Sequence, residues 1–155
     1  MNGTTQIIKG NRYLLWIVFW LFLASVCLSQ NAKAPLIANL TRSHMTGCGC
    51  YFGFPEREGS WVLEADDGDS VAWVNINGVD TKLKLDRSTF AQKEFEVNDK
   101  FSEFYSGSSY QVEVHYVVKR LPTEKDYEWT KMTATIIVRR GATKSVLRLD
   151  GGCGC

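Results

Sequence analysis

Residues 60–86 read SWVLEADDGDSVAWVNINGVDTKLKLD and contain three strand-like runs separated by two turn signals. The run SWVLEAD ends at the acidic stretch DDGD, and SVAWVNI follows immediately. Asn77-Gly78 comes next, and this dipeptide is the strongest short signal for a hairpin because both residues tolerate the positive φ that the turn requires. The run VDTKLKLD then alternates, with a valine and leucines on one face and lysines on the other. Residues 60–86 therefore predict two successive antiparallel hairpins.

Two later runs show the same period of two residues. QVEVHYVVK (111–119) and TKMTATIIVRR (130–140) each place apolar side chains on one face, and TKSVLRLD (143–150) follows a turn at Arg140-Gly141. No stretch of ten or more residues keeps a helical period with caps. The best helical candidate, STFAQKEF at 88–95, fits equally a loop that leads into a strand. Seven to eight short strands joined by turns predict an all-β domain, a small antiparallel β-sandwich or barrel.

A Cys-Gly-Cys tripeptide stands at each end of this β region. Cys48 and Cys50 form the first pair and Cys153 and Cys155 the second, with no cysteine between the pairs. Residues i and i+2 of a strand point to the same face, so each tripeptide presents two thiols side by side. If the first and last strands are neighbours, the four sulfurs converge.

Two chemistries suit four converging thiols. The first is a pair of disulfides that join the N- and C-terminal strands, which we expect for an exported domain. Antiparallel strands would pair Cys48 with Cys155 and Cys50 with Cys153, whereas parallel strands would pair Cys48 with Cys153 and Cys50 with Cys155. The second is a tetrathiolate of the same four cysteines around Zn²⁺ or Cu(I), although zinc sites usually space their cysteines more widely. His44, four residues before Cys48, is a possible nitrogen ligand, but on a polar linker we expect it to be solvated.

The N-terminal residues have the composition of an export signal. Lys9 and Arg12 precede seventeen uncharged, mostly apolar residues, 13–29, and small and polar residues follow. This order predicts a signal peptide at 1–29, a linker at 30–46 and the β domain at 47–155. Two alternatives are an uncleaved membrane anchor formed by residues 13–29 and a lipid-modified Cys27. All three interpretations place the domain outside the cytoplasm, secreted or periplasmic.

Composition and charge exclude several function classes. The chain has 155 residues, of which 45% are hydrophobic and 23% charged, as in an ordinary globular domain. Without Lys9 and Arg12, sixteen basic residues face seventeen acidic ones, a net charge of −1, so we expect no nucleic-acid partner. No motif for a catalytic nucleophile, a metalloprotease or a phosphate-binding loop is present, and we expect neither enzymatic activity nor a cofactor. His115 lies mid-strand at a polar position and is expected to be exposed.

The β region is rich in aromatic residues for its size. Core packing accounts for most of them, and aromatic side chains exposed on a sheet would indicate a carbohydrate or protein contact. The export signal, small barrel and terminal disulfides together resemble periplasmic lysozyme-inhibitor domains, and this resemblance is one of architecture alone. It implies a non-enzymatic binding or interaction module of the cell envelope, with a protein or glycan partner. The loop RLPTEKDYEW (120–129) is the segment expected to reach that partner. The alternative function is thiolate metal binding by the two Cys-Gly-Cys pairs.

Overall fold

The computed structural model describes residues 33–154 except 58, 67–69, 92–93 and 124–128. The predicted signal peptide or anchor, Cys27 and Cys155 lie outside the described residues. Nine strands and no helix are found within the described ranges: β1 (Ile37–Ala38), β2 (Gly49–Gly53), β3 (Trp61–Asp66), β4 (Val71–Ile76), β5 (Val79–Ser88), β6 (Lys100–Gly107), β7 (Tyr110–Arg120), β8 (Trp129–Arg140) and β9 (Thr143–Gly154). Accordingly, the described residues include no helix long and apolar enough to span a membrane.

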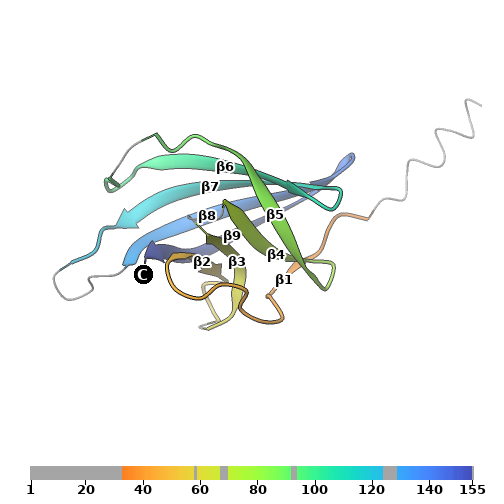
Figure 1. Ribbon diagram of the computed structural model, residues 1–155, viewed down its shortest axis with the longest axis horizontal. Helices are drawn as coiled ribbons and strands as arrows, with labels where there is room; N and C mark the ends of the chain where they lie inside the picture. Colours follow the sequence, from red (N-terminus) through yellow and green to blue (C-terminus); the bar gives the residue numbers. More distant parts are fainter. Residues whose placement is uncertain (1–32, 58, 67–69, 92–93, 124–128, 155) are drawn as a thin grey trace, which may run out of the picture. The chain divides into compact units, whose positions relative to one another are not determined.

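Strands β2 to β9 form a closed, antiparallel, up-and-down barrel (Figure 1). Each strand pairs with its neighbours in sequence, and β2 pairs with β9 to close the ring. The short strand β1 is added at the end of β4, where Ile37 lies opposite Ile76. The prediction of a small antiparallel β domain whose first and last strands meet is confirmed. Of the two predicted architectures, a sandwich and a barrel, the structure shows the barrel.

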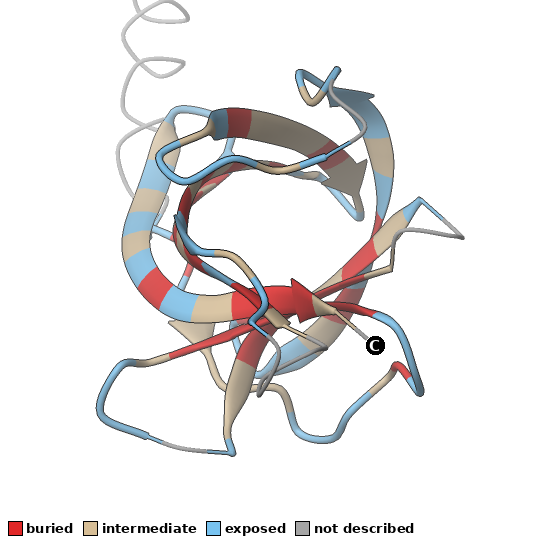
Figure 2. Cartoon of the chain, turned by 90° about the vertical axis from the view of Figure 1, so that its left-hand side faces the viewer, coloured by how far each residue is buried: buried red, intermediate tan, exposed pale blue. Residues whose placement is uncertain are grey.

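The predicted hairpin turn and the strand alternation are also found. Asn77 and Gly78 have φ angles of 56° and 84°. Figure 2 shows buried and exposed residues alternating along several strands. The inward positions of β7 and β8 are all buried: Val112, Val114, Tyr116, Val118, Met132, Ala134, Ile136 and Val138. One inward expectation fails, because Val79 is 64% exposed where β5 begins at the turn beyond the core.

Aromatic rings run through the core toward one loop. Phe52 contacts Tyr116 (ring centroids 5.4 Å apart), and Tyr116 stacks on Phe101 at 4.6 Å. Phe90 and Phe95, from the loop between β5 and β6, pack on Phe101 at 4.9 and 5.7 Å. The described residues of 88–95 form no helix. This segment is instead a loop whose phenylalanines pack against the core, which was the second of its two predicted forms.

The closing seam between β2 and β9 is rich in glycine. Cys50 lies opposite Cys153, and the register continues through Gly151 and Gly152 without a bulge. A Cβ at Gly151 would collide with the main-chain oxygen of Tyr51. Glycine is therefore required at position 151, where a side chain would meet the main chain of β2.

The segment before β2 belongs to the same compact unit as the barrel. That unit begins at Ala34, so the described part of the predicted linker packs against the domain. We call residues 36–46 the strap. Leu40 N–H donates to the main-chain oxygen of Trp61 (2.7 Å), and Asn77 N–H donates to that of Leu36 (2.8 Å).

Candidate functional site

A disulfide joins the two ends of the barrel. Cys50 and Cys153 are bonded, with Cα atoms 4.0 Å apart and 103 residues apart in sequence. This is the pairing expected for antiparallel strands. Cys48 is also disulfide-bonded, and because Cys155 lies outside the described residues, the Cys48–Cys155 bridge stays a prediction.

The metal alternative requires a different redox state. Thiolates are the sulfur ligands of metal ions, and the sulfurs of Cys50 and Cys153 are instead bonded to each other. Within the described part of the chain, no group of three or more histidine, cysteine, aspartate or glutamate side chains is placed to hold a metal ion. Metal binding by the four cysteines would thus need the reduced protein.

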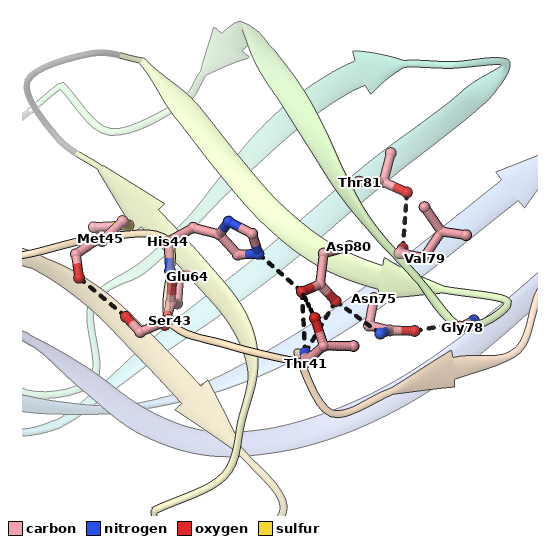
Figure 3. A network of polar contacts seen from close by, with 10 residues as sticks. All are labelled: Thr41, Ser43, His44, Met45, Glu64, Asn75, Gly78, Val79, Asp80 and Thr81. Atoms are coloured by element: carbon pink, nitrogen blue, oxygen red, sulfur yellow. Dashed lines mark hydrogen bonds and ion pairs between the residues drawn. The ribbon is translucent and has the colours of Figure 1, made fainter.

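Asp80 holds the strap on the barrel (Figure 3). Its carboxylate accepts hydrogen bonds from Thr41 N–H (3.0 Å), Thr41 Oγ1 (2.5 Å) and Asn75 Nδ2 (2.7 Å), and contacts His44 Nε2 at 2.8 Å. Burial raises the pKa of Asp80, but the hydrogen bonds from Thr41, His44 and Asn75 outweigh it and hold the pKa well below its usual value. Asp80 is therefore a charged anchor for the strap.

His44 is not solvated, contrary to the expectation for a linker residue. Its side chain is 8% exposed and its ring stacks on Trp73 at 3.9 Å, almost parallel. The error arose because the strap residues show no periodic pattern, so nothing in their sequence indicated that they cover the sheet. His44 Nε2 contacts Asp80, and the described residues place no cysteine with it to form a metal site.

A buried carboxylate lies beneath the strap. Glu64 has no exposed surface, and its Oε2 accepts the N–H of His44 at 2.8 Å, whereas Oε1 has no hydrogen-bond partner among the described residues.

Burial, together with the charges of Glu64 and Asp66, raises the pKa of Tyr51. The Tyr51 hydroxyl thus stays protonated and donates to the main-chain oxygen of Gly47 (3.1 Å).

Ser102, His115 and Glu113 form a chain of contacts on the outer face of β6 and β7. Ser102 Oγ lies 2.7 Å from His115 Nδ1, and His115 Nε2 lies 3.0 Å from Glu113 Oε1. A nucleophile, base and carboxylate are thus in order, but acyl transfer also needs donors for an oxyanion. The three side chains lie on paired antiparallel strands, whose main-chain N–H groups bond to the neighbouring strands and so do not serve as oxyanion donors. His115 is 42% exposed, in line with its expected position, and the absence of enzymatic activity stays a prediction.

A second carboxylate lies among the core tyrosines. Glu103 Oε2 accepts hydrogen bonds from the hydroxyls of Tyr105 (2.6 Å) and Tyr116 (2.9 Å). Burial is the main cause that raises the pKa of Tyr116, and Tyr105 and Glu103 add to it. These hydrogen bonds give the two tyrosine hydroxyls and the Glu103 carboxylate partners inside the barrel, which explains how a carboxylate is accommodated there.

A hollow of about 670 Å³ lies on the outer face of the closing seam. Tyr51 of β2 contacts two indoles, with ring centroids 5.6 Å from Trp61 and 5.7 Å from Trp129. Both tryptophans are partly exposed, whereas Tyr51 is 9% exposed. The three rings form an aromatic arc in the lining, and Phe54 adds a fourth ring.

Glycines make room for this arc. A Cβ at Gly53 would lie 3.6 Å from Trp61 Cε3, and one at Gly152 would lie 3.3 Å from Trp129 Cε3. Each indole thus packs over a glycine of the seam, which stabilises a region that has few side chains of its own. Covering the seam accounts for one side of each ring, and the partly exposed remainder is available to a ligand.

Charged side chains of mainly one sign surround the hollow. Among the residues that the structure describes, its charged lining residues are Arg57, Lys119, Lys131 and Asp150, all exposed. Trp129 is the last residue of the loop (120–129) that was expected to reach a partner, and Lys119 directly precedes that loop, whose residues 124–128 lie outside the described residues. The C-terminal end of that loop therefore reaches the hollow.

Sequence reasoning identified only part of this site. Trp129 closes the loop (120–129) that was expected to reach a partner, but its meeting with Tyr51 and Trp61 was not predicted. Their meeting depends on β2 and β8 both flanking β9. The available signal was the glycine run of 151–152, because bare backbone on a sheet attracts aromatic neighbours.

Comparison of the chain with protein-family models, with curated proteins and with solved structures finds no match. The resemblance to lysozyme-inhibitor domains therefore stays an architectural expectation. The class that the structure defines is an eight-stranded, up-and-down, disulfide-bonded β-barrel.

Proposed function

We propose that the protein is an exported, non-enzymatic binding module that takes its ligand in the hollow beside the closing seam. The observation that carries the proposal is the aromatic arc of Tyr51, Trp61 and Trp129 in a hollow of about 670 Å³. Binding sites are usually concave and lined by aromatic side chains with a few polar groups. The disulfide of Cys50 and Cys153 is compatible with an extracellular or periplasmic location, where such bonds persist.

The position of the hollow supports this proposal. Its floor is the β2–β9 seam, which is held by the disulfide and by the pairing of β2 with β9 and of β9 with β8. The site is therefore formed before a ligand arrives. A preformed site loses little conformational entropy on binding. Rings on strands of a closed barrel are held more rigidly than rings on loops.

A ligand screen with three variants tests the proposal. The full-length protein is applied to an array of glycans and peptides, beside Trp61→Ala, Trp129→Ala and the control Phe104→Ala. Phe104 is a partly exposed aromatic residue of β6 that does not line the hollow. We expect ligands whose signal is lost with either tryptophan variant and kept with Phe104→Ala, all four proteins having comparable melting temperatures. Signals that survive both tryptophan substitutions, or no bound ligand at all, would contradict the proposal.

A further inference from the structure

The charges around the hollow indicate the class of ligand. Of the described lining residues, three are cations, Arg57, Lys119 and Lys131, and one, Asp150, is a carboxylate. Among the described residues none of the three cations has an ion-pair partner, and the guanidinium of Arg57 lies 5.9 Å from the centre of the Phe54 ring. Exposed cations at the edge of a concave site attract anions, because the surrounding protein focuses their field.

The rest of the domain does not share this positive charge. Without Lys9 and Arg12 the chain carries a net charge of −1, so the cations of the hollow are a local feature. Proteins that bind single-stranded nucleic acid combine stacking rings with a positive groove that follows the backbone over several nucleotides. The hollow has the rings but only a short cationic rim, which favours a small anionic group beside a flat ring over a polynucleotide.

The ring geometry favours a sugar. Trp61 of β3 and Trp129 of β8 both contact Tyr51, and each indole is tilted by 53° to the tyrosine ring. The apolar face of a pyranose ring can lie against a partly exposed indole, while hydroxyl groups at its edge reach polar atoms such as Thr133 Oγ1 and the Asp150 carboxylate. Two indoles accommodate more than one sugar unit.

We infer that the hollow binds an acidic glycan, a sugar chain with carboxylate or sulfate groups, whose rings contact Trp61 and Trp129 and whose anions pair with Lys119 and Lys131. This inference rests on the proposed function and adds the chemical class of the ligand. Exposed ion pairs contribute modestly, so each lysine is expected to change the affinity by about two- to fivefold. Added salt weakens the same contribution.

Isothermal titration calorimetry with matched probes tests the inference. The full-length protein is titrated with an oligogalacturonate hexamer, its fully methyl-esterified form, a heparin hexasaccharide, a thymidine hexanucleotide and a hexaglutamate peptide. The variant is Lys119→Gln/Lys131→Gln, and the control is Lys84→Gln/Lys144→Gln, which changes two exposed lysines outside the hollow. We expect at least one acidic sugar to bind more tightly than the ester by about tenfold, and to lose most of that advantage in the variant alone.

The other outcomes separate the two proposals. Equal binding of acid and ester that Trp129→Ala abolishes would overturn the acidic class and keep the binding module. Tighter binding of the hexanucleotide or of hexaglutamate would overturn the glycan. If no sugar binds, the inference fails, and the screen with the tryptophan variants decides the proposed function independently.

Discussion

Removing the cysteines of the closing seam should cost a large part of the stability of the domain. Cys50 and Cys153 are 103 residues apart in sequence, so their bond closes a loop that includes almost the whole barrel. Chain-entropy estimates give about 4.7 kcal/mol for a loop of about 100 residues. The free energy of unfolding of a domain of ordinary stability is about 5–15 kcal/mol, so this loss is at least about 30% of the total.

Two variants divide this free energy between the bridges. Replacing Cys48, Cys50, Cys153 and Cys155 by alanine opens the loop completely and should lower the free energy of unfolding by about 4.7 kcal/mol. Replacing Cys50 and Cys153 alone should cost less than half as much, because the predicted Cys48–Cys155 bridge still closes nearly the same loop. The corresponding fall in melting temperature for the fourfold variant is roughly 15–25 °C for a domain of this size.

Urea denaturation followed by tryptophan fluorescence measures both changes, with mass spectrometry to establish the state of each thiol. Lys144→Gln serves as the control, because it changes an exposed residue of β9 away from the seam and should leave the transition unchanged. If the fourfold variant loses less than about 1 kcal/mol, the seam does not constrain the unfolded chain as argued.

The remaining predictions concern the strap, the hairpin and export. Asp80→Asn should lower stability at neutral pH by at least about 1.5 kcal/mol, the scale of one hydrogen bond to a charged group. Because folding lowers the pKa of Asp80, the carboxylate stabilises the fold fully above its unfolded pKa near 4, and this stabilisation is lost as the pH falls toward the folded pKa. The difference in melting temperature between Asp80→Asn and the wild type should therefore shrink in acid. A difference that stays constant with pH would contradict the charged anchor. Gly78→Val should destabilise by more than about 1 kcal/mol because φ is positive there, whereas Gly78→Asn should be tolerated; equal melting temperatures would argue against the turn. Terminal sequencing of the protein from its own cell should find a mature chain that begins near Gln30 in an extracytoplasmic fraction, and an intact Met1–Cys155 chain in the cytosol would refute export.

The fold was predictable where local chemistry decides it. Asn77-Gly78 determines its own turn, and the alternation in β7 and β8 follows from one face packing on the core. The pairing of β2 with β9 was only conditional, because contacts about a hundred residues apart leave no local pattern. The two Cys-Gly-Cys tripeptides were the one signal for it.

The candidate site was predictable only in part, for the same reason. Trp129 and Tyr51 come from strands that are not neighbours in sequence, and they meet because β9 lies between β2 and β8. His44 could not be placed because the strap has no periodicity, and its contact with Asp80 depends on where the strap crosses β4 and β5. In each case the deciding interaction is between side chains far apart in the sequence, which only the tertiary fold brings together.

The most direct test of the binding claim is to observe the indole N–H resonances of the full-length protein during ligand titration. Tryptophan-to-phenylalanine variants assign the signals of Trp61, Trp73 and Trp129. Trp73 is the internal control because it stacks on His44 and does not line the hollow. We expect the Trp61 and Trp129 resonances to shift in proportion to bound ligand while that of Trp73 stays in place. Saturating binding that shifts only Trp73, or none of the three, would contradict a ligand site in the hollow.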